Sequence, residues 1–388
     1  MIKDFLTPIK DILLANLALQ PESCLGNKIN IHTNKNDFPD IEGAQIAIFG
    51  VQEDRNSENN FGCGEDLFLV RKKLYALFPG NWNTKIVDLG NITKGAEVSD
   101  TYFAVSEILT ALLTRNIIPI IIGGGQDITY INYRAYDALE QTVNITTVDS
   151  RFDLGSLDDQ LSSQSYLSKI IMQTPNNLFN YCNVGYQTYF NSQESIQLLD
   201  SLYFDAYRLG NAKELEIIEP AFRNADIVSI DLGAVRQSEA PANNNASPNG
   251  FYGEEICAIS RYAGLSDKVT SFGIYEYNSK LDVNSQTANL IAQMIWYFIE
   301  GVNARVKDYP FSGKENYQKF TVLLDDDDPL IFYKSHKTGR WWIEINILSD
   351  NKYKRHALIP CTYKDYTEAT NQKIPEKWYK AMQKMMAS

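Results

Sequence analysis

The stretch IIIGGGQDITY (residues 120–130) decides the fold. Three consecutive isoleucines, without alternation of polar residues, are typical of a strand that is buried on both faces of a parallel sheet. The three glycines that follow allow the backbone to turn sharply and to come close to a ligand. Open α/β sheets bind their ligands at the carboxyl ends of such strands. We therefore expect Gln126 and Asp127, which come next, to lie at a ligand site.

Strand and helix patterns alternate on both sides of this stretch, from residue 44 to about residue 305. Short apolar runs predict strands, and SDTYFAVSEILTALLTRN (99–116) places its apolar residues on one helical face. This alternation predicts an α/β fold of three layers, with a mostly parallel sheet flanked by helices. The predicted strands are 44–51, 84–90, 117–122, 144–149, 179–187, 226–232 and 269–277.

The last part of the sequence has a different pattern. LIFYKSHKTGRWWIEINI (330–347) predicts a β-hairpin with Gly339 in its turn, and IPEKWYKAMQKMM (374–386) predicts a final helix. A module of about 80 residues without a disulfide or metal is marginal alone, so we expect this α+β extension to dock on the α/β domain or on a neighbouring subunit. We expect three parts: a lead-in (1–43), an α/β domain (44–306) and the extension (307–388).

Charge and composition narrow the classes of partner. The net charge of −12 argues against nucleic acid or an anionic membrane as a partner. The N-terminal segment breaks its apolar residues with Asp4, Lys10 and Asp11, so it predicts neither a secretory signal nor a membrane span. The five cysteines are odd in number and lack metal-binding spacing, which indicates free thiols and a cytoplasmic location.

Acidic residues, and not histidines, follow the predicted strands. No histidine lies between residues 33 and 335, so a site in the middle of the chain has to work without imidazole. Asp149 and Asp153 in DSRFD, Asp231 in SIDLG and Glu276 in IYEYN can converge at the carboxyl ends of neighbouring strands. A bare carboxylate cluster raises its own pKa values, so it must either bind a cation or pair with arginines.

Four motifs, in the same order, resemble those of the ureohydrolase (arginase/agmatinase) superfamily and, within it, the formimidoylglutamases. IIIGGGQDITY resembles GGGH-(D/E), ITTVDSRFD resembles N-x-D-A-H-x-D, VSIDLGAVRQSEAP resembles S-x-D-x-D…P, and GIYEYN resembles V-E-x-N. The resemblance implies an arginase-like fold, a homo-oligomer, and hydrolysis of linear amidine C–N bonds by two manganese ions that are bridged by hydroxide.

The resemblance carries over to only part of the metal site. It implies Asp149, Asp153 and Asp231 as ligands of a first metal, with Gln126 in place of a histidine as a weak oxygen ligand. The resemblance also implies two ligands that bind only the second metal, and Arg151 and Gly233 stand at their positions in this sequence. A binuclear centre is therefore not expected.

Two arginines offer another way to balance the carboxylates. Arg151 is two residues from Asp149, so on a strand both side chains would share a face, and Arg236 lies just beyond the third motif. We expect these guanidinium groups to neutralise the carboxylates, and therefore expect no cofactor. The alternative is one Mn²⁺ or Mg²⁺ ion on Asp149, Asp153 and Asp231.

We predict a family member that has lost the binuclear manganese centre, is inactive or strongly impaired as an enzyme, and binds a ligand or a protein partner. The ligand would be small and cationic or amino-acid-like, in contact with Gln126, Arg151, Ser163 and Glu276. Two alternatives stay open. One is a mononuclear amidine or guanidine hydrolase that uses Asp149, Asp153 and Asp231, with Glu276 facing the substrate. The other is an assembly component that acts through residues 307–388.

Overall fold

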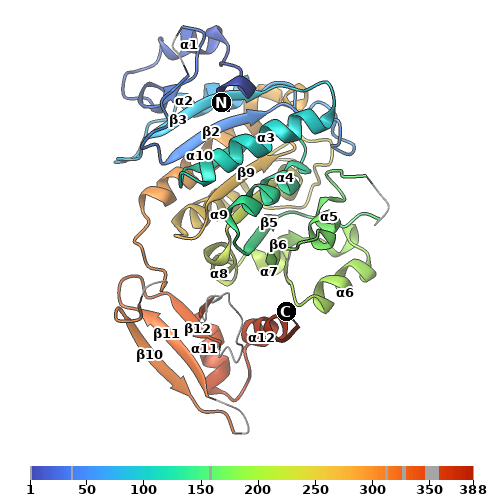
Figure 1. The fold of residues 1–388 in the computed structure, drawn as a ribbon, viewed down its shortest axis with the longest axis vertical. Coiled ribbons are helices and arrows are strands. Elements are labelled where there is room, and N and C mark those ends of the chain that lie inside the picture. The colour runs from blue at the N-terminus through green and yellow to red at the C-terminus, as the bar shows by residue number, and fades with distance from the viewer. Residues whose placement is uncertain are drawn as a thin grey trace.

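Two sheets organise the chain (Figure 1). The computed structural model describes residues 2–35, 38–156, 160–310, 313–325, 329–345 and 358–387. Within these residues, the first sheet has nine strands, paired in parallel in the order β1-β3-β2-β4-β9-β8-β5-β6-β7. This confirms the predicted α/β fold with a mostly parallel sheet. The strands are β1 (Asn30–Ile31), β2 (Ile46–Val51), β3 (Ile86–Ile92), β4 (Ile118–Ile122), β5 (Val143–Val148), β6 (Leu178–Tyr186), β7 (Asp205–Arg208), β8 (Ile227–Asp231) and β9 (Ser271–Tyr275).

Helices cover both faces of this sheet and give it two separate cores. Every residue of β2, β4 and β5 is buried, as expected for strands between two helical layers. One core joins the sheet to α1 (Asp11–Leu17), α2 (Phe68–Tyr75), α8 (Leu215–Asn224), α9 (Gly253–Leu265) and α10 (Gln286–Asn303). The other joins it to α3 (Val98–Leu113), α4 (Ile128–Ala135), α5 (Tyr166–Met172) and α6 (Gln193–Ser201).

Short helices complete the α/β part. Most are single turns of 3-10 helix at the ends of strands or of longer helices, and α7 (Leu209–Ala212) follows β7. Within the described residues, no helix is both long enough and apolar enough to cross a membrane. The 3-10 turns are Ile2–Phe5, Leu25–Lys28, Tyr136–Leu139, Thr188–Phe190, Leu232–Ala234, Ser279–Leu281 and Val283–Ser285.

The second sheet is antiparallel and belongs to the C-terminal extension. The predicted hairpin is β11 (Leu330–Ser335) and β12 (Trp341–Glu344), with Gly339 in the turn at φ +71°. Phe332, Ile343 and the ring of Trp341, stacked 4.9 Å from Tyr366, form its core. The other elements are β10 (Tyr317–Val322), β13 (Leu358–Cys361), α11 (Tyr363–Thr370) and α12 (Glu376–Ala387).

A buried arginine of the α/β part contacts this extension. Arg223 of α8 donates from Nη1 to the carbonyl of Trp341 (2.9 Å) and from Nη2 to the carbonyl of Cys361 (3.0 Å). Its guanidinium also lies 4.6 Å from the ring centroid of Trp342. These contacts support our proposal that residues 307–388 dock on the α/β domain.

Candidate functional site

The acidic residues singled out in the sequence lie at the carboxyl ends of four adjacent strands. In the sheet order β4-β9-β8-β5, Gln126 follows β4, Glu276 follows β9, Asp231 ends β8, and Asp149 and Asp153 follow β5. Gln126, Asp149 and Glu276 are each at most 2% exposed, and Asp153 is 7% exposed. The cluster is thus a set of polar groups withdrawn from water at the edge where α/β sheets bind ligands.

The glycine stretch brings the ends of β4 and β9 together. Gly124 has φ +75°, and a Cβ on it would lie only 2.8 Å from the carbonyl oxygen of Glu53, so a larger residue does not fit. The Gly124 carbonyl accepts from the Glu276 amide (3.0 Å), and the Gln126 amide donates to Oε1 of Glu276 (3.0 Å). The predicted close backbone approach therefore serves to place Gln126 and Glu276.

Two of the acidic residues hold unusual backbone conformations. Asp153 has φ +51° and Glu276 has φ +68°, both in the left-handed region that non-glycine residues seldom adopt. Such strain persists only where the surrounding structure imposes it, and it concentrates at functional sites. Eight other non-glycine residues of the described part of the chain also have positive φ, so the two conformations support a site at the ends of β5 and β9 only together with the clustering of the carboxylates.

The three aspartates destabilise one another's charged forms. Burial raises the pKa of Asp153 well above its usual range, and the charge of Asp149 raises it further. Burial also raises the pKa of Asp231 well above its usual range, with Asp149 and Glu276 adding to the shift. The pKa of Asp149 is raised by burial as well, although hydrogen bonds to its carboxylate oppose this. The expected self-repulsion of the cluster is present.

Several oxygens of the cluster have no hydrogen-bond partner. Within the described residues this holds for Oδ2 of Asp149, Oδ2 of Asp153 and Oε1 of Gln126, all of which are buried. Burying an oxygen without a hydrogen-bond partner costs free energy. Coordination to a hard cation offsets this cost. The donor atoms therefore fit one oxygen-liganded ion in their chemistry. Their present arrangement is not a complete ligand set, because the described part of the chain holds no group of three or more His, Cys, Asp or Glu side chains poised around one point.

The arginines do not balance the cluster as expected. The Arg151 guanidinium lies 4.3 Å from the ring centroid of Phe190, and that of Arg236 lies 3.5 Å from the ring centroid of Tyr252. None of the ion pairs found among the described residues joins either arginine to the aspartates. The expected pairing is wrong because β5 ends at Val148, so the alternation of a strand no longer fixes where Arg151 points.

The position of the second metal offers no replacement ligand. Gly233 has no side chain, and its amide donates to Oδ1 of Asp231. The Arg151 backbone amide donates to Oδ1 of Asp149 (2.8 Å), and the charge of its side chain acts on the aspartates without an ion pair among the described residues. The donor atoms present are compatible in chemistry with one cation, and the expectation that a second ion does not bind stays a prediction.

Glu276 is held by residues that the sequence analysis did not single out. Its Oε2 accepts from Ser57 Oγ (2.7 Å) and from Asn60 Nδ2 (2.8 Å). Burial raises its pKa to about 7 against the effect of these hydrogen bonds. Ser57 and Asn60 precede the stretch FGCGED, and no local pattern in the sequence indicates that they reach the end of β9.

Two further polar residues near the cluster are engaged by protein groups. Asp127 accepts from the hydroxyl of Tyr102, and burial raises its pKa to about 7. Ser163 Oγ accepts from the amide of Glu58 (2.9 Å), and the Ser163 amide donates to the carbonyl of Asn56 (2.9 Å). Ser163 thus joins two loops beside the site, and a role in ligand binding stays a prediction.

Comparisons with known proteins agree with this geometry. The chain is 23% identical over 301 residues to formimidoylglutamase from Streptococcus gordonii, covering 72% of this chain and 90% of that protein. It is 27% identical over 266 residues to formimidoylglutamase from Geobacillus sp., covering 64% of this chain and 80% of that protein. The resemblance to formimidoylglutamases noted in the sequence is confirmed.

Solved structures share the fold. Formimidoylglutamase from Bacillus subtilis matches with a TM-score of 0.61 and 17% identity, over 71% of this chain and 97% of that one. A formiminoglutamase from Trypanosoma cruzi, solved with Mn²⁺, matches with a TM-score of 0.64 and 19% identity, over 69% of this chain and all of that one. This finding contradicts the expectation that the site has no cofactor, which rested on pairing of the aspartates with Arg151 and Arg236, and no such ion pair is found among the described residues. The sequence model described as the arginase family matches residues 44–300, and the chain belongs to that family.

Proposed function

We propose that this protein binds one manganese ion on Asp149, Asp153 and Asp231, with Gln126 as a weak fourth ligand. We further propose that it recognises a small cationic or amino-acid-like ligand there without the rapid hydrolysis of its family. The observation that carries the proposal is the contrast between the two metal positions. Buried oxygens of the first position have no partner among the described residues. By the family resemblance, Gly233 and Arg151 replace the ligands of the second position, and Arg151 stacks on Phe190.

Electrostatics support the metal part of the proposal. Burial raises the pKa values of all three aspartates, and the charge of Arg151 offsets this only in part. The nearest candidates, Arg151 and Arg236, stack on aromatic rings. A divalent cation would favour the charged carboxylates and satisfy their free oxygens.

The same residues support weak hydrolysis. A two-metal site lowers the pKa of a bridging water and holds it for attack, and this requires ligands for both ions. Every residue of the cluster comes from the part of the chain between residues 33 and 335, which has no histidine, so the cluster itself contains no imidazole that could move a proton. Glu276 is anchored on both oxygens by Ser57, Asn60 and the Gln126 amide, and it can therefore orient a cationic group.

Elemental analysis of protein purified with Mn²⁺ tests the metal part. We expect one manganese per chain, its loss in Asp153→Asn, and its retention in the exposed control Asp200→Asn. Two manganese ions per chain would overturn the proposal, and so would equal manganese in Asp153→Asn and the wild type.

An activity panel tests the catalytic part. Arginine, agmatine, guanidinobutyrate and formiminoglutamate should be hydrolysed at rates near background by the manganese-loaded protein. A turnover of about 1 s⁻¹ or more on any of them, which lies in the usual range of enzymes, would overturn this part alone.

A mononuclear hydrolase is the second candidate, and one observation favours it. The pKa of Glu276 is about 7, near the value at which a carboxyl group exchanges protons most effectively at neutral pH. This candidate predicts manganese-dependent turnover in the same panel. Glu276→Gln should abolish that turnover, while Asp200→Asn, at an exposed position outside the cluster, should keep most of it.

A further inference from the structure

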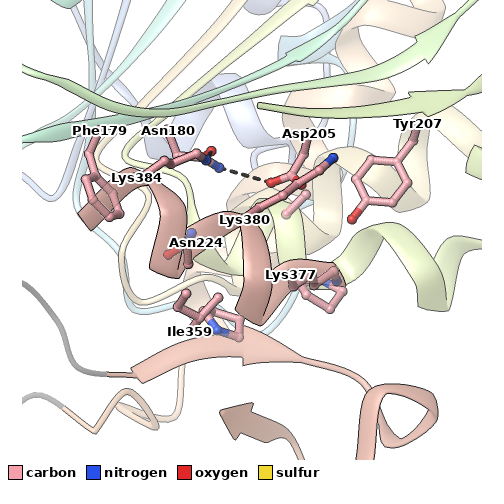
Figure 2. Close-up of a pocket in the computed structure, with 13 residues that line it drawn as sticks. Phe179, Asn180, Asp205, Tyr207, Asn224, Ile359, Lys377, Lys380 and Lys384 are labelled. Carbon is pink, nitrogen blue, oxygen red and sulfur yellow. Dashed lines mark hydrogen bonds and ion pairs between the residues drawn. The ribbon is translucent and has the colours of Figure 1, made fainter. Parts of the chain in front are cut away.

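A second polar site lies where the C-terminal extension meets the edge of the large sheet (Figure 2). A cavity of about 40 Å³ lies between β6 and β7, the end of α8, β13 and α12. It is remote from the carboxylate cluster, and three of its walls, β13, α12 and the end of α8, do not take part in that site. The family model ends at residue 300, so β13 and α12 lie outside it.

Three lysines of α12 line this cavity. Lys377, Lys380 and Lys384 are spaced at i, i+3 and i+7, which places them on one face of the helix. In the sequence this pattern is typical of a solvated face. In the structure the face is turned toward the strand edge, where Asn180 and Asp205 are joined by a 3.3 Å hydrogen bond (Figure 2).

Two of these ammonium groups have protein partners. Lys380 donates to the carbonyl of Phe204 (3.1 Å) and forms ion pairs with Glu376 (2.8 Å) and Asp205 (3.8 Å). Lys384 donates to Oδ1 of Asn180, a neutral group. Burial lowers the pKa of Lys384 to about 8 although Asp205 opposes this, and Nζ lies 5.4 Å from the ring centroid of Phe204.

The third ammonium group is unsatisfied. Nζ of Lys377 is buried and has no hydrogen-bond partner among the described residues. An ammonium group carries three hydrogen-bond donors and no acceptor. Nζ of Lys377 therefore needs an acceptor that does not belong to the described residues. Burying it bare is costly, and this points to a missing anion or acceptor in the cavity.

The charge and size of the cavity define what fits. Its lining carries three lysines against one carboxylate, Asp205, because Glu376 has a side chain that is 77% exposed and lies outside the lining. The volume is several times the roughly 10–15 Å³ that one water molecule needs, but it is too small for a sugar or a base. A compact oxyanion matches both properties.

We propose that this junction binds one free tetrahedral oxyanion, phosphate or sulfate, between Lys377, Lys380 and Lys384. The anion would accept hydrogen bonds from a helix of the extension that itself packs on β6 and β7. Its binding would therefore strengthen the docking of the extension on the α/β domain. The proposal is independent of the manganese site.

Isothermal titration of the full-length protein with inorganic phosphate tests the proposal. Sodium chloride should hold the ionic strength constant, because screening alone changes weak electrostatic binding. We expect one saturable site per chain, with affinity lowered at least tenfold in Lys377→Gln and changed less than twofold in Lys364→Gln. Lys377 makes no hydrogen bond that folding could lose, while Lys364 is an exposed lysine of α11 that lies outside the cavity.

Three outcomes would overturn the proposal: no saturable phosphate binding to the wild type, equal binding to Lys377→Gln, or equal weakening in both variants. Sulfate and glycerol phosphate separate the possible sources of the oxyanion. Competition by sulfate supports a free oxyanion. Binding of glycerol phosphate without binding of inorganic phosphate would show a site for a phosphate ester and would overturn the proposal as stated.

Discussion

Asp88 and Asp149 are both buried aspartates of the same sheet, yet their surroundings differ. Asp88 accepts from Nε of Arg71 (2.8 Å), from the hydroxyl of Tyr75 (2.8 Å) and from the amide of Gly90 (3.0 Å). Asp149 accepts the Arg151 amide on one oxygen, while its second oxygen has no partner among the described residues. Both aspartates are nearly inaccessible, at 0% and 2% exposure.

This difference supports a structural role for Asp88 and our proposal that Asp149 binds a ligand. Arg71 supplies a full charge and two donors to Asp88, so that network is complete without anything from outside. The Asp149 cluster brings several carboxylates together, and its arginines lie on aromatic rings. Burial is common to both aspartates, so the unsatisfied oxygen of Asp149 is the feature that supports our proposal of a ligand there.

The largest effect should come from breaking the complete network. Arg71→Met leaves Asp88 buried and unpaired, so we expect a loss of roughly 3–5 kcal/mol in the free energy of unfolding, measured by urea denaturation. The double variant Arg71→Met/Asp88→Leu should recover much of this loss, because both charges are then gone. A loss below about 1 kcal/mol in the single variant would show that Asp88 is no more dependent on its partner than Asp149 is.

Manganese should stabilise the protein through the cluster of Asp149 and not through Asp88. At a concentration 100 times its dissociation constant, Mn²⁺ should stabilise the metal-free wild type by about 2.7 kcal/mol. Asp153→Asn should lose this gain without unfolding, because asparagine tolerates the left-handed backbone of residue 153. Thermal unfolding with and without Mn²⁺ measures both. Equal stabilisation of Asp153→Asn would place the metal elsewhere.

The pH dependence of the stability of the metal-free protein should follow the acids whose pKa values burial raises. Asp127 and Glu276 have folded pKa values of about 7, above those of unfolded chains near 4. The folded state thus holds more protons between these limits. The contribution of each group is fully present below pH 4 and is lost as the pH rises to about 7, by on the order of 1 kcal/mol per pH unit.

Denaturation at constant ionic strength between pH 4.5 and 7.5 measures this slope. Asp127→Asn removes one titrating group, so its stability should fall less steeply with pH than that of the wild type. An exposed acid, changed in Asp200→Asn, serves as the control and should leave the slope unchanged. Identical slopes in Asp127→Asn and the wild type would contradict the expectation.

The smallest effect should come from Arg151. Its guanidinium stacks on Phe190, and a contact of this kind contributes about 0.5–1 kcal/mol at a partly exposed position. Arg151→Ala should therefore lower the stability by no more than about 1 kcal/mol. A loss near that of Arg71→Met would show that Arg151 neutralises the aspartates after all, and would remove the contrast with Asp88.

Periodicity in the sequence was sufficient for most of the large sheet. The seven predicted strands correspond to β2–β6, β8 and β9, because each is an apolar run that is buried by helices. The sequence pattern did not predict β1, which has two residues, or β7, whose sequence DAYR lacks an apolar run. Edge strands are covered on fewer sides, so burial imposes less of a pattern on them.

The site was predictable in location but not in detail. The carboxyl ends of strands fix where Asp149, Asp231 and Glu276 lie, and motif order identified them. Side chains beyond the strand ends follow loop geometry, so the stacking of Arg151 on Phe190 had no signal in the sequence. The lysine face of α12 was equally hidden, because a charged stripe has the same pattern whether it meets water or another part of the chain.

The left-handed backbone at Asp153 and Glu276 also limits how this protein can vary. Side chains branched at Cβ are strongly disfavoured there, whereas Asp, Asn and Gly adopt the conformation most easily. The substitutions tolerated at position 153 are therefore expected to be a few small residues, and Asp and Asn among them carry a side-chain oxygen. We therefore expect the backbone conformation at residue 153, as well as the chemistry of a ligand, to favour aspartate or asparagine at the end of β5.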